Sequence, residues 1–98
     1  MAFLDLKCAC ENCGDSLPVD ATNARICSFE CTFCATCVED IFFNVCPNCG
    51  GGFEKRPIRR SGLLQKFPAQ KEPFIKPHNV EDFNLLFEKF KDIPPELR

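Results

Sequence analysis

The apolar positions near the end of the chain repeat with the period of a helix. Within residues 79–92, four of them fall at i, i+3, i+4 and i+7, the spacing of one helical face. These four residues are Phe83, Leu86, Phe87 and Phe90. Asn79 is a suitable N-cap, and the Pro94–Pro95 pair cannot continue a helix. The pattern predicts an amphipathic helix over residues 79–93, with its apolar face largely buried against the rest of the chain or against a second copy.

The first half of the chain has shorter apolar patterns. Residues 24–28 are suited to a short strand, and Phe53 follows three glycines at the start of another. Residues 38–45 fit two turns of helix. The expected apolar face of that helix consists of Val38, Ile41 and Phe42.

A change in composition separates these two halves. Residues 57–78 carry four of the eight prolines among scattered lysines and glutamines, so this stretch should be an extended arm rather than a long helix or a central strand. The expected organisation is therefore a cysteine-rich domain over residues 6–56, a proline-rich basic linker over 57–78 and a helix over 79–93.

Eight of the nine cysteines form four ordered pairs. In chain order the pairs are Cys10 with Cys13, Cys27 with Cys31, Cys34 with Cys37, and Cys46 with Cys49. A C-x-x-C turn places two thiolates on one side of a tight loop, where both reach a metal at about 2.3 Å. Four thiolates make a closed tetrahedral site, so the pattern predicts two structural zinc ions per chain and leaves no position for a substrate.

The rest of the composition is consistent with metal. The cysteine-rich region is so short that a hydrophobic core alone seldom suffices, and structural zinc contributes directly to folding. Disulfides are the alternative, but the odd number of cysteines and the lack of a recognisable export signal in residues 1–7 argue against them. An iron–sulfur cluster is a further alternative. No later segment has the apolar length to span a membrane, and we expect a cytoplasmic protein.

Two pairings of the eight ligands are physically reasonable. In the interleaved pairing, the first site is Cys10, Cys13, Cys34 and Cys37, and the second is Cys27, Cys31, Cys46 and Cys49. In the sequential pairing, the four central cysteines form one cluster, and the two outer pairs, each followed by a glycine, form the other. Spacing alone does not choose between them.

The cysteine pattern over residues 10–49 resembles the RING finger, in which the sixth ligand is followed by a small helix and then C-P-x-C. That resemblance implies the interleaved pairing, with Cys31 where most RING fingers have His. It implies a small metal-stabilised α+β fold, a RING-like cross-brace with two zinc sites, short strands and one short helix. The C-terminal amphipathic helix is additional to it. Asn12 and Gly50 depart from the residues that this family uses to engage a ubiquitin-conjugating enzyme, although Pro47 agrees.

A longer match is visible within the same region. The segment Ile26-Cys-Ser-Phe-Glu-Cys-Thr-Phe-Cys34, together with the flanking Cys-Glu-Asn-Cys and Cys-Pro-Asn-Cys-Gly-Gly, resembles domain of unknown function 1272. This is a family of small bacterial proteins with no established activity. The resemblance covers about residues 8–57.

Three further features have possible roles. Cys8 is the ninth cysteine, and we interpret it as incidental rather than as a redox thiol or a substitute ligand. His78 is the single histidine and lies outside the ligand set, so no catalytic or metal role is expected. A basic cluster follows the cysteines and suggests phosphate binding as an alternative to a solvated arm. It consists of Lys55, Arg56, Arg59 and Arg60.

The predicted function is a non-enzymatic zinc module for protein–protein interaction. No catalytic or cofactor-binding residues are recognisable, because the chain shows neither a nucleophile–base set nor a phosphate-binding glycine loop. The expected partner is another protein or a second copy, bound through the Phe-rich helix. Nucleic-acid binding is the alternative, although a net charge of −2 does not favour it, and a RING-type ligase scaffold is a more remote one.

Overall fold

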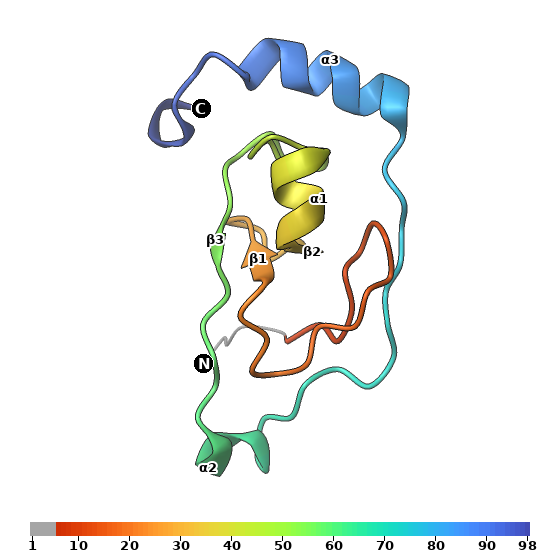
Figure 1. The fold of residues 1–98 in the computed structure, drawn as a ribbon. Helices are drawn as coiled ribbons and strands as arrows, with labels where there is room; N and C mark the ends of the chain where they lie inside the picture. The colour runs from red at the N-terminus through yellow and green to blue at the C-terminus, as the bar shows by residue number, and fades with distance from the viewer. Residues whose placement is uncertain (1–5) are drawn as a thin grey trace.

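A three-stranded antiparallel sheet lies at the centre of the molecule. The structure is a computed structural model and describes residues 6–98; the first five residues of the N-terminal segment, on which the expectation of no export signal rests, lie outside the described range. The strands are β1 (Ala24–Ile26), β2 (Thr32–Cys34) and β3 (Glu54–Lys55), in the spatial order β2-β1-β3 (Figure 1). β1 pairs with β2 with Arg25 opposite Phe33, and with β3 with Arg25 opposite Lys55. The small α+β fold class expected from the sequence is confirmed.

The short helix in the cysteine-rich region begins and ends earlier than the sequence predicted. α1 spans Ala35–Asp40, whereas the apolar pattern placed a helix over 38–45. Phe43 and Asn44 have φ angles of 48° and 62°, so the backbone turns into the left-handed region and no helix continues. Val38 and Phe42 are buried as expected, but Ile41 is exposed.

The core of this region is a cluster of phenylalanine rings. Phe33 on β2 lies between Phe42 and Phe53, with ring centroids 5.0 Å and 5.5 Å away in edge-to-face arrangements. Aromatic pairs favour this geometry because the positive ring edge meets the negative ring face. Since the three rings come from β2, the loop after α1 and the residue before β3, they fix these segments relative to one another.

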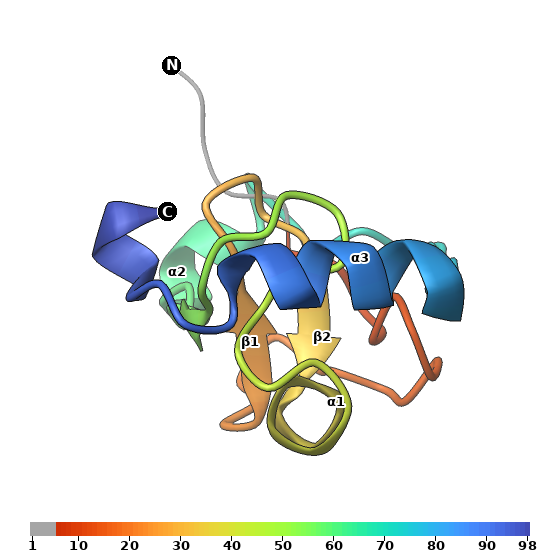
Figure 2. The same ribbon diagram turned by 90° about the horizontal axis from the view of Figure 1, so that it is seen from above.

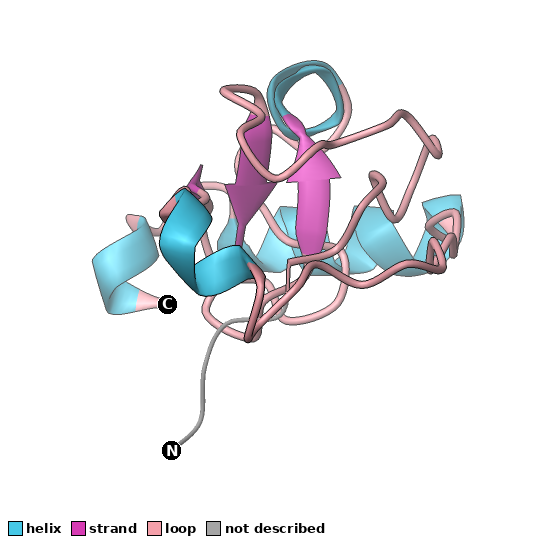
Figure 3. Cartoon of the chain, turned by 90° about the horizontal axis from the view of Figure 1, so that it is seen from below, coloured by secondary structure: helices cyan, strands magenta, loops and turns pink. Residues whose placement is uncertain are grey.

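The C-terminal half of the chain wraps around this core. The arm after β3 is not wholly extended as predicted, because it contains the short helix α2 (Ser61–Leu64). It then runs in an extended path to α3 (Val80–Phe90) and the 3-10 turn η1 (Pro95–Leu97) (Figures 1 and 3). The predicted N-cap is confirmed, since the Asn79 side chain accepts a hydrogen bond from the Asp82 backbone N–H at 3.0 Å.

The apolar face of α3 packs against the cysteine-rich region of the same chain (Figure 2). Phe83 is only 5% exposed, and its ring centroid lies 5.2 Å from that of Phe42. The ring centroid of Phe87 lies 5.9 Å from that of Phe43. Leu86, Phe87 and Phe90 are half-buried rather than fully buried, so the helix lies over the surface of the core with one side chain inserted.

Across residues 6–98, no helix has the length and apolar character needed to cross a membrane.

Candidate metal centres

The structure brings the first set of four cysteines together. The sulfurs of Cys10, Cys13, Cys34 and Cys37 all lie within 4.8 Å of one another. Two of these separations are 3.8 Å, for Cys10 to Cys37, and 3.7 Å, for Cys13 to Cys34. Sulfurs at 2.3 Å from a central metal are separated by about 3.8 Å in a regular tetrahedron. A disulfide needs about 2.05 Å, so these separations are compatible with a shared metal ion rather than with disulfides.

Local backbone geometry places these sulfurs. Cys10 and Cys13 lie on a tight turn that closes with a hydrogen bond from the Gly14 N–H to the Cys10 carbonyl at 3.0 Å. Gly14 has a φ of 81°, a conformation that glycine adopts without strain. Cys34 ends β2, and Cys37 lies in α1, which begins one residue after Cys34. The turn that ends at Gly14 and the junction of β2 with α1 thus bring the four sulfurs together.

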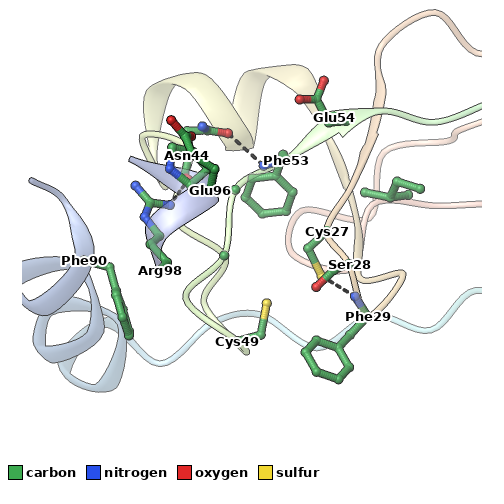
Figure 4. Close-up of a pocket in the computed structure, with 14 residues that line it drawn as sticks. Cys27, Ser28, Phe29, Asn44, Cys49, Phe53, Glu54, Phe90, Glu96 and Arg98 are labelled. Carbon is green, nitrogen blue, oxygen red and sulfur yellow. Dashed lines mark hydrogen bonds between the residues drawn. The ribbon is translucent and has the colours of Figure 1, made fainter. Parts of the chain in front are cut away.

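The second set is assembled less completely. The sulfurs of Cys27, Cys31 and Cys46 lie within 4.8 Å of one another, but within the described range the Cys49 sulfur lies outside that group. Cys49 and Cys27 both line a cavity of about 690 Å3 beside this cluster (Figure 4). The turn from Cys46 repeats the first one, with a hydrogen bond of 2.9 Å from the Gly50 N–H to the Cys46 carbonyl. Cys49 therefore lies beside the cluster, on the turn that carries Cys46.

Two asparagines donate hydrogen bonds to cysteine sulfurs. Asn12 Nδ2 lies 3.5 Å from the Cys37 sulfur, and Asn48 Nδ2 lies 3.4 Å from the Cys31 sulfur. Both asparagines precede the last cysteine of a repeated Cys-x-Asn-Cys-Gly sequence, at residues 10–14 and 46–50. Their role was missed by the sequence reasoning, although the repeat was the signal that could have revealed it.

The clusters resist full ionisation without a cation. The hydrogen bond with Cys46 lowers the pKa of Cys27 to about 5, and the same bond raises the pKa of Cys46. In the first cluster, burial raises the pKa of Cys13 to about 11 and also raises the pKa of Cys37. Neighbouring thiols thus retain protons because several thiolates in one partly buried site would repel one another and be poorly solvated. A divalent cation would offset both the repulsion between thiolates and their poor solvation. The two cysteine clusters are therefore able to hold metal ions.

The remaining candidate residues lie elsewhere. Cys8 is half-buried, belongs to neither cluster in the described structure, and has its sulfur 4.0 Å from the Lys71 carbonyl oxygen. Arg56 is 1% exposed rather than part of a basic surface, and its guanidinium donates to three backbone carbonyls. These are the carbonyls of Lys7 at 2.7 Å, Pro18 at 2.9 Å and Leu17 at 3.4 Å. Burial lowers the Arg56 pKa.

A second buried charge supports the first cluster. Glu11 lies between Cys10 and Asn12 and is buried. Its Oε2 accepts hydrogen bonds from the Lys7 ammonium at 3.0 Å and from the Thr32 backbone N–H. In addition, the Glu11 N–H donates to the Thr32 carbonyl at 3.0 Å. Glu11 therefore fastens the first cysteine turn to β2, close to Cys34.

Comparison with known proteins places the chain in a family. Residues 3–59 match the family described as "Protein of unknown function (DUF1272)", and the chain belongs to that family. It is also 47% identical over 75 residues to "Uncharacterized protein R02474" of Rhizobium meliloti (strain 1021). The aligned residues cover 76% of this chain and 89% of the relative. That aligned length exceeds the family match, so the similarity extends past the cysteine-rich region. No solved structure matches the chain.

Proposed function

We propose that this protein is a non-enzymatic zinc-binding module that acts through protein–protein interaction. The observation that carries the proposal is the arrangement of the first cluster, whose four sulfurs all lie within 4.8 Å of one another, with two separations close to that of a tetrahedral site. Zn2+ is the metal that best suits four thiolates in a tetrahedron with a structural role. When bound, it supplies a rigid crosslink between the first cysteine turn and the β2–α1 junction.

The proposed ligands are the eight paired cysteines in the interleaved arrangement. Cys10, Cys13, Cys34 and Cys37 would hold the first ion, and Cys27, Cys31 and Cys46 would hold the second together with Cys49. Inclusion of Cys49 is supported by its place on the turn from Cys46 and by the cavity that it shares with Cys27. Both sites would then be closed by protein sulfur, which leaves no metal position for a reacting water.

A protein partner is supported by large apolar side chains that remain on the surface. Phe29 is 75% exposed beside the second cluster, and Phe43 is 60% exposed in the turn after α1. Phe83, Phe87 and Phe90 of α3 pack against the chain's own core, so a partner or a second copy could use that face only by displacing the helix. A cytoplasmic location remains our proposal, since it is a compartment in which unpaired thiols stay reduced and can bind metal.

Elemental analysis of the purified chain tests the metal. We expect two zinc ions per chain, and their removal by a chelator under reducing conditions should unfold residues 8–56, because the phenylalanine core there is small. One zinc, or iron with visible absorbance, would contradict the two-site proposal. Retention of native NMR dispersion after complete metal removal would contradict the structural role.

Cadmium substitution tests the pairing. The Cys34→Ser and Cys10→Ser variants should perturb the same 113Cd resonance, while Cys27→Ser should perturb the other one. The reason is that loss of one thiolate changes the coordination of the metal that its three partners still hold. If Cys34→Ser and Cys27→Ser affect the same resonance, the sequential pairing is correct.

The geometry gives little support to nucleic-acid binding. Of the four basic residues after the cysteines, Arg56 is buried against carbonyls and Arg59 donates to the Phe67 carbonyl at 2.5 Å. Phosphate binding needs several exposed cations on one surface. We expect no salt-dependent mobility shift with DNA or RNA, and such a shift would restore this alternative.

A further inference from the structure

A short part of the C-terminal arm runs along the first cysteine turn. A Cβ added at Gly14 would lie 3.2 Å from Ile75 Cδ1, and the Lys76 N–H donates to the Glu11 carbonyl at 2.6 Å. His78 then donates its backbone N–H to Asn12 Oδ1 at 3.0 Å. Figure 1 shows this segment beside the N-terminal loop, on its way to α3. Residues 75–78, called the strap below, thus contact the turn that carries Cys10 and Cys13.

His78 joins the strap to α3. Its Nδ1 lies 2.8 Å from Asn12 Oδ1, which gives the histidine a second contact with the same oxygen. The ring also lies edge-to-face with Phe42 at 5.0 Å and with Phe83 at 5.6 Å. Because Phe83 is the most buried side chain of α3, the position of His78 depends on whether that helix is docked.

Asn12 completes the connection to the cluster. While its Oδ1 accepts from His78, its Nδ2 lies 3.5 Å from the Cys37 sulfur. A continuous set of contacts therefore leads from α3 through His78 and Asn12 to a ligand of the first cluster. Asn48 makes the matching contact with Cys31 of the second cluster, but within the described residues it forms no hydrogen bond with the strap.

We propose that the strap is a positioning element for the first metal centre, with His78 orienting Asn12 toward the Cys37 sulfur. The inference rests on the proposed metal-binding function. A hydrogen bond to a thiolate fixes its orientation and removes negative charge from the sulfur, and outer contacts of this kind change metal affinity 10–100-fold. His78 is thus not a metal ligand, but it raises the affinity with which the cysteines of the first cluster hold the metal.

The linkage between helix and metal is reciprocal. If docking of α3 tightens the first site, then metal in that site must stabilise the docked helix by the same factor. The second site should not share this linkage, because Asn48 has no hydrogen bond to the strap among the described residues. The chain thus contains a matched internal control.

The experiment measures metal release from the full-length, metal-loaded protein to an excess of chelator. The two sites are distinguished by their 113Cd resonances. We expect His78→Ala to accelerate metal release from the first site about 10–100-fold. The rate of release from the second site should stay within about twofold of that of the unmodified protein. His78→Phe keeps an aromatic ring beside Phe42 and Phe83. It should also accelerate metal release from the first site, because it loses the Nδ1 contact with Asn12.

A double-mutant cycle tests whether the effect passes through Asn12. Asn12→Ala and His78→Ala should be strongly non-additive in the release rate, whereas Asn48→Ala and His78→Ala should be additive. Amide hydrogen exchange gives the reciprocal measurement. Exchange in α3 should become faster in Asn12→Ala and stay unchanged in Asn48→Ala.

The possible outcomes separate the two proposals. An unchanged release rate in both His78 variants, or equal acceleration at both sites, overturns the positioning role while leaving the metal sites intact. If His78→Ala does not fold, His78→Phe and the Asn12 and Asn48 exchange measurements decide the question. A chain that binds no metal at all overturns the proposed function itself.

Discussion

Arg56 and Glu11 are buried charged residues with different kinds of partner. Glu11 is paired with Lys7, so its charge is balanced, whereas the guanidinium of Arg56 is solvated by three carbonyls. Those carbonyls belong to residues on both sides of the first cysteine turn, so one side chain holds residues 7, 17 and 18 to the end of β3. Removal of a buried donor leaves its acceptors unsatisfied, which costs more than the hydrogen bonds contributed.

Arg56→Met should therefore destabilise the metal-loaded protein strongly. Methionine keeps much of the apolar stem but satisfies none of the three carbonyls, and we expect a loss of about 2–4 kcal/mol. The measurement is the denaturation midpoint at saturating zinc. Arg60→Met, at an exposed position nearby, is the control and should change the midpoint by less than about 0.5 kcal/mol. Equal effects of the two variants would contradict the role of Arg56.

The thiols make metal uptake dependent on pH. Burial raises the pKa of Cys13 to about 11 and also raises that of Cys31, so the metal-free protein holds these protons at neutral pH. Binding must displace them, because thiolate is the ligand. Affinity should thus rise with pH and fall on acidification. Calorimetric titrations with zinc in buffers of different ionisation enthalpy should show net proton release, and buffer-independent heats would contradict this.

At the scale of elements, the sequence predicted what depends on local spacing. The Phe-rich helix and its Asn79 cap follow from periodicity and are confirmed, and β1 was placed almost correctly. β2 was not predicted, because its residues lie among the cysteines and show no alternation of their own. The end of α1 was wrong because it depends on two non-glycine residues, Phe43 and Asn44, with positive φ.

Relations between distant residues were beyond the sequence. Both ligand pairings use the same local turns and differ only in which distant turns meet. The hydrogen bond from the Glu11 N–H to the Thr32 carbonyl is one such long-range contact, and it holds the first turn beside β2 and Cys34. The burial of Arg56 was equally invisible, since a basic residue beside other basic residues normally faces solvent. Periodicity showed that α3 has an apolar face but not what that face contacts.

The docking of α3 can be tested on two residues of the same helix. Phe83→Ala removes a buried ring that contacts Phe42, and we expect a loss of about 3 kcal/mol together with faster hydrogen exchange in α3. Leu85→Ala is the control, because Leu85 is 76% exposed and should have an effect near zero. Similar losses in both variants would mean that α3 is not seated as described.

For the whole molecule, the C-terminal segment contributes packing rather than ligands. All eight proposed ligands precede residue 50, while the arm and α3 cover Phe42 and the first cysteine turn. Removal of the C-terminal arm and α3 should therefore lower stability, whereas removal of a cysteine ligand should lower metal binding.

A chain that ends at Pro57 should still bind two metal ions but be less stable. It loses the burial of Phe83 and the partial burial of three other apolar side chains, on the order of 3 kcal/mol or more. Metal content and the thermal midpoint of the shortened chain measure the two effects. Loss of one metal ion on truncation, or an unchanged midpoint, would contradict this division of roles.

The interleaved pairing that we propose would also set an order of events during synthesis. Ribosomes release the chain from its N-terminus, so the first cluster is complete once Cys37 has emerged, twelve residues before Cys49. The strap and α3 emerge last of all. With metal bound as proposed, a nascent chain would acquire its first ion while the second site is unfinished. His78 would reach Asn12 only after both sites have had the opportunity to fill. The order in which the segments appear thus favours loading of the metal before closure of the strap over it.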